Sequence, residues 1–237
     1  MNTEKLLECV QLTKQYGIKH AVDHMDFVLE PGHITGLLGP NGSGKTTLIK
    51  MAAGLLKPTG GEIRILGEAP GVRSCSLVSY LPDRVYLPKT ATAASLIEYY
   101  LDFYEDFDAA RADRMIRDLG IDPDQQIRAL SKGTVEKVQL ILCMSRRASL
   151  YLLDEPIAGV DPAARDYIIR TIIGNYNPGS SVLISTHLIQ DVENILTDIV
   201  FIRNGQVILH DTKEGVREHT GKTVDQYFRE VFACWGC

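Results

Sequence analysis

Apolar residues follow strand-like patterns in many short segments along the chain. Some of these segments are continuous apolar runs, which are typical of buried strands, and others alternate apolar with polar positions. Pro31 and Gly32 supply one turn between them, and Asn204 and Gly205 supply a hairpin turn. The predicted strands are residues 6–12, 21–29, 33–38, 62–66, 77–81, 150–153, 181–185, 199–203 and 206–210.

Helical spacing appears between these strands and dominates one continuous part of the chain. Asp108 is a good N-cap for one helix there, and Gly120 a good stop, while Pro162 suits the first turn of a later helix. Residues 87–145 are therefore expected to form a mostly helical lobe, inserted into a core of residues 1–86 and 146–237. The predicted helices are residues 48–53, 92–107, 109–119, 135–145, 189–196, 223–232 and one that begins at Pro162.

The strongest chemical signal lies between the third predicted strand and the first predicted helix. Three glycines let the backbone curl until several N–H groups point at one anion, and the helix adds the positive end of its dipole. Lys45 can reach the β- and γ-phosphates of a nucleotide, and the hydroxyl of Thr46 can bind Mg²⁺. The segment is Gly39, Pro40, Asn41, Gly42, Ser43, Gly44, Lys45, Thr46 and Thr47.

A second signal follows the apolar strand at residues 150–153, where Asp154 and Glu155 stand side by side. Carboxylates at the carboxyl end of a buried strand reach the edge of the sheet where phosphate sites form. Asp154 can hold Mg²⁺, directly or through water. Glu155 can polarise an attacking water because it adjoins the metal-binding residue.

Composition narrows the class of protein. The chain has 237 residues, 45% of them hydrophobic, which is enough for a sizeable core. The formal net charge of −5 gives no support for a nucleic-acid partner. No apolar run approaches the roughly 20 residues that span a bilayer, and the N-terminus lacks a signal pattern, so a cytoplasmic protein is expected. The scattered cysteines are expected to be reduced, and the C-terminal pair Cys234 and Cys237 is interpreted as incidental rather than a redox site.

Together these motifs resemble the nucleotide-binding subunit of an ABC (ATP-binding cassette) transporter over nearly the whole chain. Residues 39–47 match the family's Walker A loop, and residues 150–154 match its Walker B strand. Tyr16, placed in the loop after the first strand, matches the aromatic residue that stacks on the base. His187 matches the switch histidine, Asp161 lies in the D-loop, and Leu-Ser-Lys-Gly-Thr at residues 130–134 stands at the signature loop.

The resemblance implies a P-loop NTPase of ABC architecture: a mixed sheet with an antiparallel β lobe and the inserted helical lobe. It implies ATP and Mg²⁺ as cofactors, Glu155 and His187 as catalytic residues, and a head-to-tail homodimer or heterodimer. Each ATP would lie between the Walker A loop of one subunit and Ser131, Lys132 and Gly133 of the other. The implied partner is an integral membrane permease, which would hold the subunit at the inner face of the membrane.

Two alternatives remain open at this point: a soluble ABC-type ATPase without a transport role, and a nucleotide-dependent regulator. Tandem cassettes, long coiled-coil insertions and zinc modules, which mark the soluble relatives, have no counterpart in the sequence. The presence of both Glu155 and His187 favours turnover over pure regulation.

Two positions depart from the family pattern. Asp83 stands where a metal-binding Gln is usual, and Lys132 stands where the signature has Gly. Asp83 can still bind Mg²⁺ or water, and its negative charge is expected to be partly offset by Lys132 across the dimer. The same variants resemble ATPases of bacterial exporters, so export is the expected direction of transport.

Overall fold

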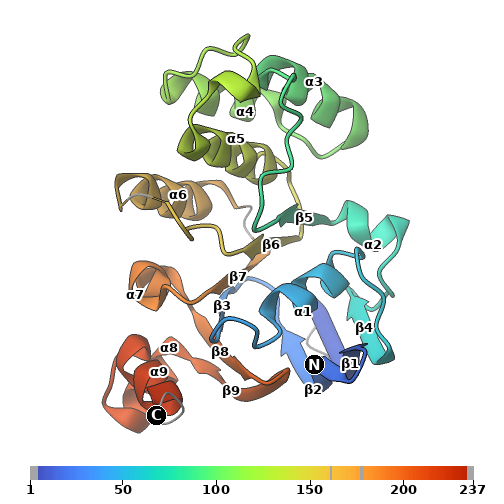
Figure 1. The fold of residues 1–237 in the computed structure, drawn as a ribbon, viewed down its shortest axis with the longest axis vertical. Coiled ribbons are helices and arrows are strands. Elements are labelled where there is room, and N and C mark those ends of the chain that lie inside the picture. The colour runs from blue at the N-terminus through green and yellow to red at the C-terminus, as the bar shows by residue number, and fades with distance from the viewer. Residues whose placement is uncertain (1–4, 161, 177–178, 234–237) are drawn as a thin grey trace.

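The computed structural model describes residues 5–160, 162–176 and 179–233, with only the backbone described at 162–164. Its centre is a six-stranded sheet in which five strands are parallel and the edge strand β9 is antiparallel (Figure 1). The four inner strands bury almost every side chain, since helices or a second sheet cover both faces. The strand order is β5 (Val78–Leu81), β6 (Leu150–Asp154), β7 (Ser181–Thr186), β3 (Ile34–Leu38), β8 (Asp198–Arg203) and β9 (Gln206–Thr212).

A smaller antiparallel sheet covers one side of this core. It consists of β2 (Lys19–Leu29), β1 (Leu7–Tyr16) and β4 (Gly60–Ile65). Helix α1 (Lys45–Ala52) lies between the two sheets, and one hydrophobic cluster joins its buried side chains to both of them. The start of α1 is therefore fixed by packing on two sides.

Helices cover the opposite face and the ends of the large sheet (Figure 1). A second cluster packs the sheet against helices from the last third of the chain. Besides α1, the described helices outside the helical lobe are α2 (Val72–Ser76), α6 (Pro162–Asn175), α7 (Ile189–Val192), α8 (Lys213–Thr220) and α9 (Val224–Ala233), with a 3-10 turn at Glu193–Ile195.

The remaining helices stand together at the top of Figure 1. They are α3 (Ala93–Phe103), α4 (Ala109–Asp118) and α5 (Lys132–Met144), with a 3-10 turn at Ile127–Ala129. Their buried apolar residues form a third cluster, which runs from Leu87 to Leu142 in sequence. Asp108 caps α4 as expected, because its Oδ1 accepts the Arg111 N–H at 2.9 Å.

The expected α/β class, with a mixed sheet and an antiparallel sheet, is confirmed, and several details were wrong. Helix α1 begins at Lys45 rather than at residue 48, and helix α3 ends at Phe103 rather than at residue 107, since Tyr104 has an extended backbone. Tyr16 is the last residue of β1 rather than a loop residue, since it pairs with Lys19. Helix α5 begins at Lys132 rather than at residue 135, because Ser131 caps it by accepting the Thr134 N–H. Helices α2 and α8 were not predicted.

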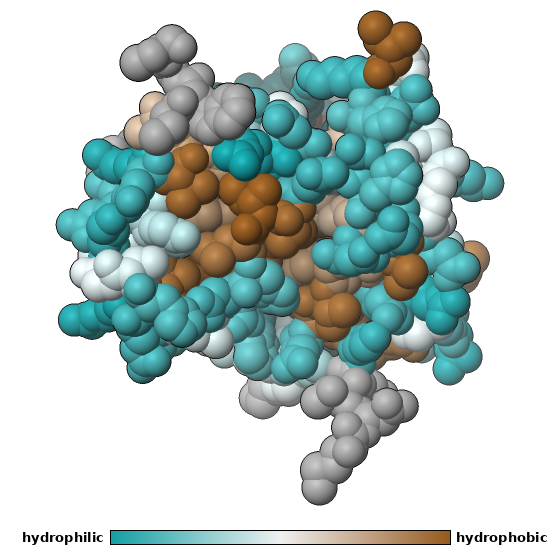
Figure 2. All heavy atoms as spheres, turned by 90° about the horizontal axis from the view of Figure 1, so that it is seen from below, coloured by the Kyte–Doolittle hydropathy of each residue, from teal (hydrophilic) through white to brown (hydrophobic). Residues whose placement is uncertain are grey.

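Polar side chains cover most of the face that Figure 2 shows. Figure 2 views the molecule from below, and on this face apolar side chains form a band that polar side chains surround. Among the described residues, no helix has both the length and the apolar character that a membrane crossing requires. Cys9, Cys75 and Cys143 are free thiols, whereas Cys234 and Cys237 lie outside the described residues.

Candidate functional site

The glycine-rich loop joins the end of β3 to the start of α1 and fits into a tight space. A Cβ on Gly39 would lie 2.4 Å from the carbonyl oxygen of Ile202. Gly44, the N-cap of α1, has a φ of 112°, and a Cβ there would lie 2.4 Å from the carbonyl oxygen of Ala21. Both positions therefore require glycine, and the loop conformation depends on them.

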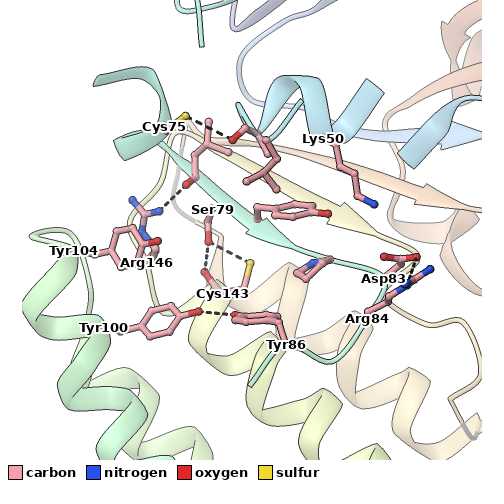
Figure 3. Close-up of a pocket in the computed structure, with 15 residues that line it drawn as sticks. Lys50, Cys75, Ser79, Asp83, Arg84, Tyr86, Tyr100, Tyr104, Cys143 and Arg146 are labelled. Atoms are coloured by element: carbon pink, nitrogen blue, oxygen red, sulfur yellow. Dashed lines mark hydrogen bonds and ion pairs between the residues drawn. The ribbon is translucent and has the colours of Figure 1, made fainter. Parts of the chain in front are cut away.

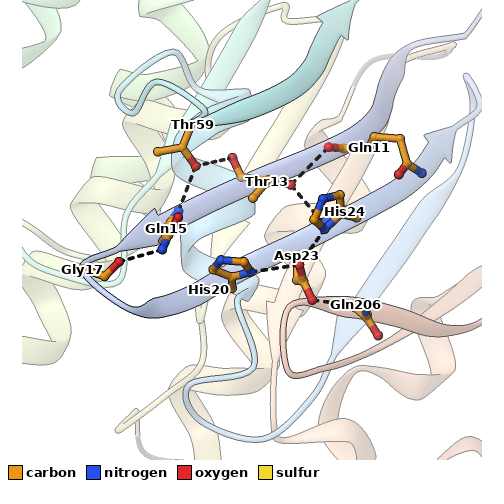
Figure 4. A network of polar contacts seen from close by, with 9 residues as sticks. All are labelled: Gln11, Thr13, Gln15, Gly17, His20, Asp23, His24, Thr59 and Gln206. Atoms are coloured by element: carbon orange, nitrogen blue, oxygen red, sulfur yellow. Dashed lines mark hydrogen bonds and ion pairs between the residues drawn. The ribbon is translucent and has the colours of Figure 1, made fainter.

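The turn between β8 and β9 is hydrogen-bonded to the glycine-rich loop. Gly205 N–H donates to the Ser43 carbonyl at 2.9 Å, and Asp23 N–H donates to the Gly205 carbonyl at 3.0 Å. The Asp23 carboxylate in turn accepts hydrogen bonds from His24 and His20, and these lower its pKa (Figure 4). The phosphate-binding loop is thus linked to strand β2 through a hairpin more than 150 residues away in the chain.

Tyr16 lies beside the loop at the tip of the β1–β2 hairpin. Its side chain is about half exposed, at 52%, and the Lys14 ammonium lies 5.4 Å from the ring centroid. Neighbouring polar residues hold the hairpin in place: Thr59 donates to the Thr13 carbonyl, and Gln15 donates to the Gly17 carbonyl (Figure 4). The ring is therefore available for stacking on a ligand.

These elements enclose a cavity of about 390 Å³. Its walls come from the glycine-rich loop, the tip of the β1–β2 hairpin and the segments that follow β5 and β6. The lining residues are Tyr16, Lys19, Ala21, Asn41, Gly42, Gly44, Lys45, Thr46, Thr47, Asp83 and Glu155. Sequence reasoning did not single out Lys19 or Ala21, because neither belongs to a motif.

Lys45 is buried, and its ammonium is surrounded by oxygen atoms. The Nζ donates to the Gly39 carbonyl at 2.8 Å and to the Pro40 carbonyl at 3.3 Å. It also lies 3.4 Å from Oε1 of Glu155. The positive charge is therefore held at the mouth of the glycine-rich loop, where a phosphate would meet both the amine and the backbone N–H groups.

Asp154, at the end of β6, is fully buried below the loop. Its Oδ1 accepts hydrogen bonds from Thr46 at 3.1 Å and from Ser185 at 2.6 Å. Its Oδ2 is buried and has no hydrogen-bond partner among the described residues. Burial raises the pKa of this carboxyl group. The unpaired carboxylate oxygen beside a threonine hydroxyl is the donor set that Mg²⁺ prefers, so these two residues fit the ion.

Glu155 adopts an unusual backbone conformation next to Asp154. Its φ is 50°, in the left-handed region, and its N–H donates to both the carbonyl and the hydroxyl of Ser185, each at 3.0 Å. The carboxylate Oε2 lies 3.0 Å from Nδ1 of His187. Ser185 thus holds both Asp154 and Glu155, a role that the sequence did not reveal because it depends on the pairing of β6 with β7.

The signature residues are not part of this cavity. Ser131, Lys132 and Gly133 lie at the start of α5 in the helical lobe, and none of them lines the cavity. The Lys132 ammonium lies 3.7 Å from Glu136 in the same helix, and a Cβ on Gly133 would meet open space. Asp83 does line the cavity, and Asp161 lies outside the described residues.

Comparison with known proteins identifies the family. The family model described as ABC transporter matches residues 22–158, more than half of the chain. The SkfA peptide export ATP-binding protein SkfE of Bacillus subtilis is 31% identical over 210 residues, which is 86% of this chain and 88% of that protein.

Solved structures show the same fold. An ATP-binding subunit of an ABC transporter superposes with a TM-score of 0.84 at 26% identity, covering 95% of this chain and 99% of that one. A dimeric ATP-binding cassette in a post-hydrolysis state with ADP and Pi gives a TM-score of 0.75 at 19% identity, covering 87% of this chain and 98% of that one. The chain therefore belongs to the ABC transporter family and is an ATP-binding, ATP-hydrolysing cassette of that family.

Proposed function

We propose that this cassette uses ATP hydrolysis to drive export through a separate membrane permease. The observation that supports turnover most strongly is the convergence of Lys45, Asp154 and Glu155 at one edge of the sheet, with His187 against Glu155. Similarity to SkfE, a peptide export ATP-binding protein, supports export over import.

Different residues of the cavity are proposed to bind different parts of ATP and Mg²⁺. The Tyr16 ring would stack on the adenine, and the backbone N–H groups of the glycine-rich loop with Lys45 would hold the phosphates. Thr46 and Asp154 would hold Mg²⁺, which neutralises phosphate charge when bound. Asp83 is proposed as a further oxygen ligand, because it faces the same cavity.

Glu155 is proposed as the general base. Its carboxylate would accept a proton from the attacking water, and its Oε1 lies 3.4 Å from the Lys45 ammonium. His187 would orient the carboxylate through its Nδ1 contact and place its other ring nitrogen toward the γ-phosphate. Ser185 fixes Glu155 by accepting its N–H.

A second cassette is proposed to complete each site. Ser131, Lys132 and Gly133 begin the 13-residue helix α5, whose N-terminal N–H groups and dipole suit a phosphate. Because these residues do not line their own subunit's cavity, they would have to serve another subunit's ATP. The dimeric ADP-bound cassette of similar fold supports this arrangement.

The permease is proposed to contact the groove between the helical lobe and the core (Figure 3). The groove has a volume of about 510 Å³ and is lined by Lys50 of α1, Arg84 after β5 and Tyr100 of α3, among others. The exposed aromatic side chains of Tyr99 and Phe103 on α3 extend this surface. Binding there would hold the subunit at the inner face of the membrane, although none of its described helices spans a bilayer.

Residues 87–145 are proposed to act as one structural unit between the core segments 1–86 and 146–237. The third hydrophobic cluster supports this division, since all of its fully buried residues lie between Leu87 and Leu142. The end of α5 also packs in the cluster of the large sheet, through Leu140, Cys143 and Met144, so a movement of this unit during the ATP cycle would carry the adjoining part of the core with it.

Replacing Glu155 with Gln tests the proposed function. Without a base, the ATP hydrolysis rate should fall by at least about a hundredfold, while ATP affinity is retained. Steady-state phosphate release and binding of a fluorescent ATP analogue measure the two quantities. The matched variant Lys45→Ala should instead lose affinity for the nucleotide. Wild-type turnover in Glu155→Gln would exclude Glu155 as the base. The proposed permease partner is tested separately: if no membrane protein co-purifies with the subunit from its host, that part of the proposal is wrong.

A further inference from the structure

One face of α5 and of the turn that follows it carries three buried residues that bind the segment from Ser76 to Tyr86. Gln139, Cys143 and Arg146 follow one another at intervals of four and three residues, so they lie on one side of the helix. Their exposed fractions are only 2–3%. A helix does not bury an amide and a guanidinium without partners, and each of these residues has them.

The contacts run in opposite order along α5 and along the segment that contains β5. Arg146 donates to the carbonyls of Ser76 and Val78, the second at 2.6 Å. The carbonyl of Cys143 accepts the hydroxyl of Ser79 at 2.8 Å (Figure 3). The end of α5 and the Arg146 side chain after it are therefore bonded to the first half of β5, at Val78 and Ser79.

Gln139 extends this series past the end of β5. Its Oε1 accepts the Tyr86 N–H at 3.0 Å, and its Nε2 lies 3.4 Å from the Arg84 carbonyl. The Tyr86 hydroxyl also bonds to that of Tyr100 on α3 (Figure 3). The loop after β5 is thus attached to the helical lobe at both the backbone and the side chain of Tyr86.

Asp83 immediately precedes the two groups that Gln139 binds. It lines the nucleotide cavity, and it also lines the groove next to the helical lobe. Among the described residues, its side chain forms one ion pair, a long contact of 3.9 Å with the exposed Arg84 side chain, so its own contacts do little to fix it. Its position depends mainly on the backbone of the loop.

We propose that Gln139 is a positioning residue that sets the place of Asp83 in the nucleotide cavity by clamping the backbone of residues 84–86. The proposal rests on the proposed function, in which Asp83 is an oxygen ligand of Mg²⁺ in the ATP site. Gln139 lies eight residues after Ser131, about 12 Å along a helix. One rigid helix therefore fixes Asp83 of its own site relative to Ser131 of the neighbouring site.

The substitution Gln139→Met tests the clamp, since it keeps a side chain of similar length and removes both polar groups. The kcat for ATP hydrolysis should fall about fivefold, the factor that corresponds to one neutral hydrogen bond. The dissociation constant of a fluorescent ATP analogue should stay within about twofold, because the glycine-rich loop is untouched. Gln139→Glu keeps the acceptor for the Tyr86 N–H and should recover most of the kcat.

Asp106→Ala is the matched control. It removes the carboxylate that accepts hydrogen bonds of 3.0 and 3.1 Å from the Arg146 guanidinium, just beyond the C-terminal end of α5, and it lies outside the loop beside Asp83. This variant should lose thermal stability and keep its kcat. If Asp106→Ala lowers the kcat as much as Gln139→Met does, general loosening of α5 explains the effect and the proposal is wrong.

A double-mutant cycle separates positioning from a merely structural role. If Gln139 acts through Asp83, then Gln139→Met should have no further effect on kcat in an Asp83→Ala background. Multiplicative losses would overturn the proposal. Should Gln139→Met fail to fold, the cycle is run with Gln139→Glu, whose residual loss of kcat must likewise vanish with Asp83→Ala. The proposed function is tested separately by Glu155→Gln, so either idea can fail alone.

Discussion

At the scale of single residues, the backbone of Glu155 is held in a left-handed conformation that residues other than glycine rarely adopt. A φ of 50° brings Cβ close to the following carbonyl, which costs about 1–2 kcal/mol. The two hydrogen bonds from its N–H to Ser185 maintain that conformation. This backbone conformation directs the carboxylate toward Lys45 and His187. The folded protein is therefore less stable by the cost of the strain, and the proposed base is positioned in return.

This strain is measurable by comparing Glu155→Gly with Glu155→Ala. Both variants lack the carboxylate, so both lose the contacts with Lys45 and His187 and should lose ATP hydrolysis. Only glycine relaxes at positive φ, and its variant should be more stable than the alanine variant by about 1 kcal/mol. Chemical denaturation gives the free energies of unfolding. Equal stability of the two variants would mean that the backbone at residue 155 is not strained.

At the scale of elements, caps fix where helices begin. Asp108 caps α4 and also lies 3.2 Å from the Arg147 guanidinium, which follows α5. The hydrogen bond from the Arg111 N–H is the main reason that the pKa of Asp108 lies below its ordinary value, with Arg147 contributing. One carboxylate thus joins α4 to the segment that follows α5.

Removal of this cap should lower the free energy of unfolding by an amount that depends on pH. Asp108→Ala should lower the free energy of unfolding by about 1 kcal/mol at neutral pH. Because the pKa is lowered in the folded protein, the contribution of the ionised carboxylate is complete above the unfolded value of about 3.9. It disappears as pH falls through the lower folded value, so the two proteins should converge in strongly acidic solution.

Denaturation curves of wild type and Asp108→Ala at neutral and acidic pH check this prediction. Asp113→Ala on the same helix is the control: its partner Arg117 is exposed, and an exposed pair of this kind contributes at most about 0.5 kcal/mol. A difference between wild type and Asp108→Ala that does not shrink with acidity would show that the charge of Asp108 is unimportant.

The elements also show which parts of the structure a sequence can predict. All nine predicted strands correspond to β1–β9, because buried strands leave apolar runs. Helices α2 and α8 left no such pattern, since each buries one side chain, Ser74 and Val216 respectively. The cavity residues that belong to sequence motifs could be predicted from the sequence. The roles of Ser185 and Gln139 were not, since each binds partners more than 30 residues away.

At the scale of the whole molecule, the two halves of the proposed ATP site lie apart. The cavity residues belong to the core, and Ser131 lies in the helical lobe at the start of α5. In Figure 1 the helical lobe stands at the top and α1 lies lower down beside the small sheet, and the signature residues do not line the cavity. Two subunits arranged head to tail would bring each half against its complement, and this arrangement predicts how defective subunits behave when mixed.

The test uses Glu155→Gln as the background, so that bound ATP is not hydrolysed. Adding Ser131→Asp keeps the cap of α5, because Asp and Ser are comparable N-caps, and places a negative charge against the phosphate. Adding Lys45→Ala instead removes the phosphate-binding cation. Neither doubly substituted protein should dimerise with ATP on its own, since both of its sites would be defective.

Mixing the two proteins should restore ATP-dependent dimers, measured by size-exclusion chromatography with light scattering. In a mixed dimer one site carries both defects, and the other combines an intact Lys45 with an intact Ser131. Ser131→Asn is the control for the substitution itself, since it caps the helix without adding charge and should dimerise unaided. If instead each site were complete within one subunit, Ser131→Asp would leave ATP binding and dimerisation unchanged. Mixing would then restore nothing, because no site would draw residues from both chains.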